Sequence, residues 1–154
     1  MGASFAEIVR EVVGGSGIDP AALTFELTDS VFLTDPDRAL AVLKDLKNSG
    51  VKLALDEFGA GFSSWSNLRQ YPVDQVKIDR RFTPQLLTDK VVKMVVGSII
   101  GLSHALDLSV VAVGVETPAE FAEIAQLEAD RAQGHHFSTP LDKPALTRYV
   151  TSQG

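Results

Sequence analysis

Apolar positions along the chain follow two spacings, which alternate from one segment to the next. Short runs that are continuously apolar or alternate with polar residues predict five strands, at residues 23–28, 51–55, 74–79, 108–113 and 130–134. Apolar residues every three or four positions predict helices at 5–13, 36–48, 89–107, 118–128 and 144–150. This alternation favours an α/β domain with a parallel sheet and right-handed crossovers, and both an open sheet and a barrel fit the pattern.

Glycines and prolines set the expected ends of these elements. Gly14 and Gly15 are expected to stop the first helix, and Asp35-Pro36 and Pro118 to open later ones. The second strand is expected over residues 51–55, with Asp56 and Glu57 at its end and a glycine-rich loop directly after them.

Length and composition narrow the class of protein. A chain of 154 residues suits one domain, and 45% hydrophobic residues suffice for a sizeable core. The net charge of −6 argues against nucleic acid or an anionic membrane as a partner. The chain has no Cys, so it has neither disulfides nor a thiolate metal site. No apolar stretch reaches the roughly 18 residues of a membrane span. We therefore expect a cytoplasmic domain that does not bind a membrane.

Charged side chains gather where the predicted strands end. Asp56 and Glu57 follow an apolar strand directly, and adjacent carboxylates repel each other unless a cation lies between them. The carboxyl ends of parallel strands meet at one rim, which would bring Glu26, Lys77 and Gln133 close to this pair. Carboxylates suit Mg²⁺, Mn²⁺ or Ca²⁺. Lys77 would hold a phosphate or an activated water, or else pair with an acid across the rim.

Five motifs occur in order across nearly the whole chain, and together they resemble the C-terminal part of an EAL domain, the family of cyclic di-GMP phosphodiesterases. They occupy residues 25–30, 55–64, 72–80, 111–117 and 133–141. The resemblance implies a partial TIM-barrel-like fold with about five parallel strands and flanking helices. It also implies hydrolysis of cyclic di-GMP to linear pGpG with two Mg²⁺ or Mn²⁺ ions.

The resemblance assigns roles residue by residue. Metal ligands would be Glu26, Asp56 and Glu57, the last in place of a second Asp. Lys77 matches the lysine near the hydrolytic water, and Gln133 a glutamine beside the metal and its water. A loop that links metal binding to dimerisation would involve Asp29, Gly59, Gly61, Phe62 and Ser63.

Two departures from the family pattern shape the expected function. The Glu-Ala-Leu signature and the Asn ligand of the family do not occur upstream of Glu26, so residues 1–154 are expected to form a truncated EAL-like domain. Val113 stands where the motif Glu-Gly-Val-Glu has its first Glu, and a Val side chain can neither bind a metal nor accept a proton.

These departures predict a degenerate domain that is inactive alone and acts by protein–protein contact or self-association. A second copy or a protein partner would cover the open sheet edges. Two alternatives stay open: a cyclic di-GMP receptor without catalysis, and a phosphodiesterase completed by the missing N-terminal part.

Four further residues invite an interpretation of their own. Adjacent strand residues point to opposite faces, so His135 and His136 are not expected to share one metal. Asp79 is expected to hold a loop or to pair with Arg80. Trp65 would lie either in an interface or in the core.

Overall fold

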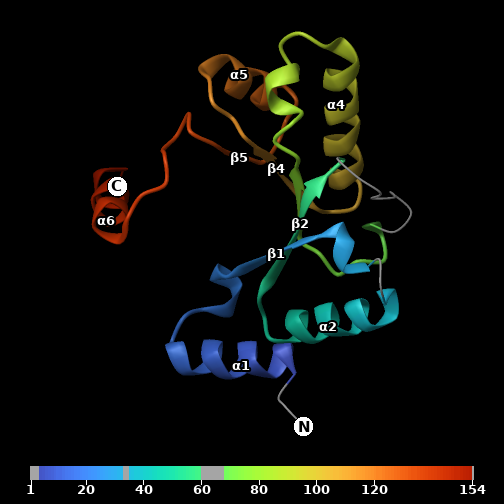
Figure 1. Ribbon diagram of the computed structural model, residues 1–154, viewed down its shortest axis with the longest axis vertical. Coiled ribbons are helices and arrows are strands. Elements are labelled where there is room, and N and C mark those ends of the chain that lie inside the picture. Colours follow the sequence, from blue (N-terminus) through green and yellow to red (C-terminus); the bar gives the residue numbers. More distant parts are fainter. Residues whose placement is uncertain (1–3, 33–34, 60–67, 154) are drawn as a thin grey trace.

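The computed structural model describes residues 4–32, 35–59 and 68–153, and Figure 1 shows its sheet with the flanking helices. The strands are β1 (Thr24–Thr28), β2 (Lys52–Phe58), β3 (Gln75–Ile78), β4 (Ser109–Val113) and β5 (Arg131–Gln133). All neighbours are parallel, and their order in the sheet is β1-β2-β3-β4-β5. A doubly wound sheet reverses its order at a switch point, whereas a barrel adds strands in sequence. The predicted α/β fold with five parallel, barrel-like strands is confirmed.

The helices are α1 (Phe5–Ser16), α2 (Pro36–Asn48), α4 (Lys90–His104), α5 (Pro118–Gln126) and α6 (Lys143–Gln153). Ser4 and Thr117 each begin a helix with a capping box, and Asp35 and Asp89 cap two others through their side chains. The expected stop of α1 at Gly14 and Gly15 is wrong. The helix continues to Ser16 and ends at Gly17, whose φ of 72° provides the left-handed C-cap.

The two faces of the sheet differ in chemistry because side chains alternate along each strand. One face is apolar and packs against α2, α4 and α5. Its members are at most 1% exposed: Leu53, Leu55, Val76, Ile78, Val110 and Ala112. Leu46, Ile99 and Ile124 bring the helices into the same core. The other face, called the polar face below, is mostly polar and carries Thr24, Glu26, Thr28, Lys52, Ala54, Asp56, Gln75, Lys77, Ser109, Val111, Val113, Arg131 and Gln133.

A β-bulge extends β2 three residues beyond its expected end. The register against β3 shifts between Leu55 and Phe58, and Glu57 lies in the bulge with a φ of 56°. This extra residue shifts the alternation, so Asp56 stays on the polar face while Phe58 is buried in the core at 1% exposure. The expected strand of residues 51–55, with the acids at its end, is therefore too short, because burial of Phe58 keeps both acids within β2.

The C-terminal helix α6 stands apart from the sheet and from the other helices (Figure 1). Its outward residues include Leu146 and Val150, which are 50% and 62% exposed. Among the residues that the structure describes, no helix combines the length and apolar character needed to cross a bilayer.

Candidate functional site

A buried lysine lies between two acids at the carboxyl end of the polar face. Lys77 on β3 is 4% exposed, and its Nζ lies 2.7 Å from Glu26 Oε2 and 3.5 Å from Asp56 Oδ2. Parallel pairing positions the three residues, because β1 and β3 both flank β2. The Glu26 and Asp56 side chains are 49% and 29% exposed, so solvent reaches this cluster from the side of the acids. The structure brings these three residues together, as predicted. Lys77 forms ion pairs with acids across the rim, which was one of the two roles expected for it.

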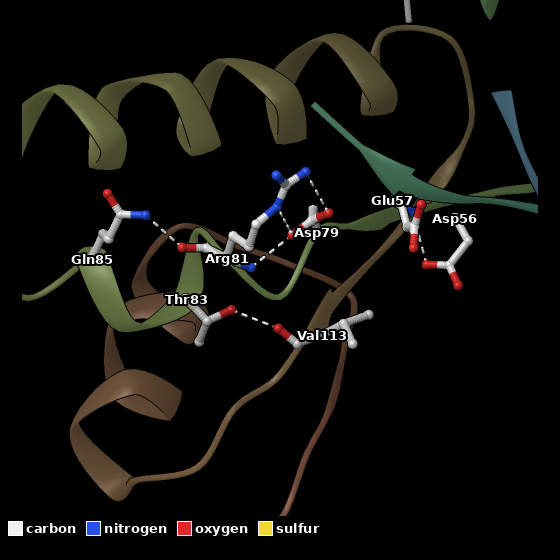
Figure 2. A network of polar contacts seen from close by, with 7 residues as sticks. All are labelled: Asp56, Glu57, Asp79, Arg81, Thr83, Gln85 and Val113. Atoms are coloured by element: carbon white, nitrogen blue, oxygen red, sulfur yellow. Dashed lines mark hydrogen bonds and ion pairs between the residues drawn. The ribbon is translucent and has the colours of Figure 1, made fainter. Parts of the chain in front are cut away.

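Glu57 does not join the ion pairs of this cluster. It is exposed at the bulge, and its backbone N–H donates to Asp56 Oδ1 at 2.8 Å (Figure 2). This hydrogen bond orients the Asp56 carboxylate toward the rim. Both acids were expected to bind metal, whereas the bulge gives them different surroundings.

The loop after β3 is fixed by Asp79 (Figure 2). One carboxylate oxygen accepts the Arg81 backbone N–H at 2.7 Å and its Nε–H at 3.0 Å, and the other accepts its terminal N–H at 3.2 Å. Burial raises the pKa of Asp79, but these hydrogen bonds from Arg81 outweigh it and hold the pKa below its ordinary value. Of the two expected alternatives, the loop-holding role is present, and the ion pair of Asp79 is with Arg81 and not with Arg80.

The true partner follows from a local rule. Asp side chains commonly accept the backbone N–H two residues on, in an Asx turn, which points to Arg81 rather than to the adjacent Arg80. Thr83 completes the loop, since its buried hydroxyl donates to the Val113 carbonyl oxygen at 2.6 Å and ties the loop to the end of β4. Sequence reasoning missed both contacts.

Two cavities open at this rim and share Arg80 and Val113. The smaller, of about 260 Å³, is lined by Asp56, Glu57, Asp79, Arg80, Arg81 and Val113. The larger, of about 400 Å³, includes Gln133 among its lining residues, together with Glu116 and His135. Gln133 therefore faces a neighbouring cavity and not the one beside Asp56. Val113, the position of the expected lost ligand, lies at the boundary between the two.

The remaining candidates differ in how far the structure describes them. Gly59, with a φ of 91°, packs so closely that a Cβ would lie 2.9 Å from the Phe82 ring. The other three loop residues of the dimerisation prediction, Gly61, Phe62 and Ser63, lie outside the described residues, as does Trp65. Asp29 begins a short 3-10 helix that ends at Phe32.

The two histidines lie in the turn after β5 and not on a strand, so strand alternation does not set their directions. His136 stacks on Phe121 with ring centroids 5.6 Å apart, while His135 lines the larger cavity.

The acids at the rim are the right type of ligand for a hard cation, but there are few of them. Glu26 and Asp56 offer carboxylate oxygens, and Mg²⁺ is commonly held by one or two carboxylates with waters and a substrate phosphate. Among residues 4–32, 35–59 and 68–153, no group of three or more His, Cys, Asp or Glu is placed to hold a metal. These residues fit a single partly hydrated cation and do not form a two-metal site among themselves.

Residues 1–140 match the model of the EAL domain family, and the chain belongs to that family. The cyclic di-GMP phosphodiesterase NbdA of Pseudomonas aeruginosa is 33% identical over 148 residues, which are 96% of this chain and 19% of that protein. Matching curated relatives are much longer, and the chain spans 18–24% of their length.

Solved structures agree with this assignment. The EAL domain of Mycobacterium smegmatis DcpA superposes with a TM-score of 0.90 at 32% identity, covering 96% of this chain and 66% of that one. A manganese and cyclic di-GMP complex of Klebsiella pneumoniae BlrP1 gives a TM-score of 0.81 at 31% identity, covering 86% and 34%.

Proposed function

We propose that this EAL domain takes part in cyclic di-GMP signalling without hydrolysing the dinucleotide by itself, and acts through contact with a protein partner or a second copy. The observation that carries this proposal is Val113. It lies where the two rim cavities meet, and its side chain offers no oxygen to a metal or a water. The family membership and the phosphodiesterase among the relatives support the signalling context.

The contacts of Lys77 support the absence of hydrolysis. Both rim acids neutralise one buried ammonium, so a cation entering the site has to compete with Lys77 for the same oxygens. Glu26 and Asp56 would hold one Mg²⁺ or Mn²⁺ if that competition is won. Such an ion would polarise a phosphoryl oxygen and lower the pKa of a bound water. The Lys77 ammonium would be the charge available to a phosphate oxygen, and Gln133 would line the neighbouring cavity.

The proposed contact with another chain rests on the edges of the sheet. β1 and β5 each pair with one neighbour among the described strands, which leaves their outer backbone groups available for pairing. A partner that adds strands there would cover both edges. Sedimentation velocity checks this part: a dimer or larger assembly is expected, and a stable monomer at all concentrations would contradict self-association.

A second candidate function is hydrolysis of cyclic di-GMP. It is favoured by the convergence of Glu26, Asp56 and Lys77, which the family resemblance assigns to metal binding and water activation. Under this alternative the chain turns over cyclic di-GMP with Mn²⁺ and loses activity in Asp56→Asn.

One assay separates the two candidates. The purified chain is incubated with cyclic di-GMP and Mn²⁺, and linear pGpG is measured by chromatography for wild type, Val113→Glu and Val113→Gln. We expect no product from wild type, because the two-metal mechanism needs both ions held in place and the described residues do not form a two-metal site. Turnover by wild type that Asp56→Asn abolishes would overturn the proposal. Activity gained by Val113→Glu and not by Val113→Gln would identify the missing carboxylate as the cause.

A further inference from the structure

The polar face continues to the amino ends of the strands, where its charge is opposite to that of the rim. Alternation along the strands places five residues on the face that also carries Lys77: Thr24, Lys52, Gln75, Ser109 and Arg131. A hydrogen bond of 3.2 Å from Gln75 Nε2 to Ser109 Oγ joins two of them across β3 and β4. With Asp74 they line one cavity of about 250 Å³.

The two cations of this cavity lack acidic partners in the part of the chain that the structure describes. Lys52 and Arg131 are exposed, and neither takes part in an ion pair there. The one acid in the lining, Asp74, is already compensated. Its Oδ1 lies 2.6 Å from Lys47 Nζ, and its Oδ2 accepts the Leu53 N–H at 2.8 Å. The cavity therefore holds two positive charges that nothing described nearby neutralises.

We propose that this amino-end cavity binds a phosphate-class oxyanion. Arg131 supplies the planar fork of donors that matches tetrahedral oxyanions, and Lys52 supplies a point charge. The hydroxyl of Thr24 adds a neutral donor, whereas the Ser109 hydroxyl already donates to the Asp74 carbonyl oxygen at 3.4 Å. Sites for drug-sized ligands span about 300–1,000 Å³, so this smaller cavity suits an ion or a phosphate group and not a whole dinucleotide.

This site is independent of the function proposed for the carboxyl-end rim. The strands are parallel, so their amino ends and their carboxyl ends lie at opposite edges of the sheet. An anion bound beside Lys52 touches none of the residues proposed to contact cyclic di-GMP or a divalent cation. Failure of either proposal leaves the other standing.

The test is a titration of the chain with inorganic phosphate against chloride at equal ionic strength, followed by NMR. Saturable shifts of the Gln75 side-chain amide and the Ser109 backbone amide are expected, with the Lys77 amide unchanged. Lys52→Met is expected to weaken phosphate binding by at least about tenfold, because it removes a charged hydrogen bond. Lys44→Met is the matched control, since Lys44 is an exposed lysine on α2 outside the cavity and should leave binding unchanged.

Further variants separate binding from folding. Lys52→Arg keeps the charge and is expected to retain binding, while Arg131→Met removes the other cation and is expected to weaken binding like Lys52→Met. Circular dichroism of each variant checks the fold. If either Lys52→Met or Arg131→Met is unfolded, the phosphate affinity of the other still tests the proposal. Shifts with no saturation, an equal loss in Lys44→Met, or shifts centred on Lys77 and Asp56 would each overturn the proposal.

Discussion

On the apolar face of the sheet, Leu53, Val76 and Val110 have no exposed surface, whereas on the polar face Glu26 and Asp56 keep contact with solvent around one buried lysine. The same strands supply both faces, so the difference comes from alternation alone. The apolar face gains stability from every side chain that leaves water. Each charge that is buried on the polar face needs a partner of opposite charge or a hydrogen bond. The charged side chains of this face therefore gather at the two ends of the strands, where solvent can reach them.

The largest expected effect is a core substitution next to a polar-face residue. Leu53→Ala should lower the free energy of unfolding by about 3–5 kcal/mol, because a fully buried leucine leaves a cavity. Its neighbour in sequence, Lys52, points to the opposite face, and Lys52→Ala in a chloride buffer should change stability by less than about 0.5 kcal/mol. Urea unfolding followed by circular dichroism measures both. Similar losses from the two variants would show that the faces are not separated as described.

The next effect concerns the close approach of the two segments that follow β4 and β5 at the rim. A Cβ at Gly134 would overlap the Val115 carbonyl oxygen, which is a backbone atom that cannot turn away. Gly134→Ala should therefore cost about 2–3 kcal/mol and displace the end of β5.

Gly101 provides the control for this substitution. It lies within α4, and a Cβ added there would point into open space among the described residues, so Gly101→Ala should stabilise by about 0.5–1 kcal/mol through helix propensity. Thermal unfolding compares the two variants. A destabilising Gly101→Ala, or a neutral Gly134→Ala, would contradict the packing around these glycines.

Much of the fold was predictable from the sequence because apolar periodicity determines both faces of the sheet. This periodicity predicts the strands around Leu53, Val76 and Val110. It also predicts that Glu26, Asp56 and Lys77 meet at one rim. The bulge at Glu57 was not predictable, since it depends on the tertiary burial of Phe58 and not on the local pattern.

The polar contacts of the loops were harder to predict than the strands. Residues 79–81 present two arginines beside one acid, and charge alone does not choose between them. The choice of Arg81 depends on a turn in which the Asp79 carboxylate accepts a backbone N–H as well as a guanidinium. The split of the rim into two cavities at Val113 depends on side-chain positions in three dimensions, which periodicity does not contain.

In the lysine cluster, removing the two acids should cost more stability than removing the lysine. Glu26→Gln with Asp56→Asn leaves the buried Lys77 ammonium without a charged partner, and should cost about 2–3 kcal/mol. Lys77→Met should cost only about 1 kcal/mol, because the two acids are partly exposed and can be hydrated. Urea unfolding at neutral pH gives both values. A greater loss in Lys77→Met would mean that attraction, and not the burial of the lysine, dominates the cluster.

The smallest expected effect is the pH dependence that Asp79 provides. Its pKa is lowered in the folded state, so its contribution to stability is present above the unfolded pKa of about 3.9 and is lost as the pH falls through the folded pKa. Wild type should exceed Asp79→Asn by about 1 kcal/mol at neutral pH, a modest value because the Arg81 side chain is 66% exposed. The difference should shrink below about pH 4. Asp45→Asn, at an exposed position on α2, is the control and should change stability at neutral pH by less than about 0.5 kcal/mol. A difference for Asp79→Asn that stays constant down to pH 2 would mean that shape and not charge gives this carboxylate its role, and that the loop beside the rim is held by packing alone.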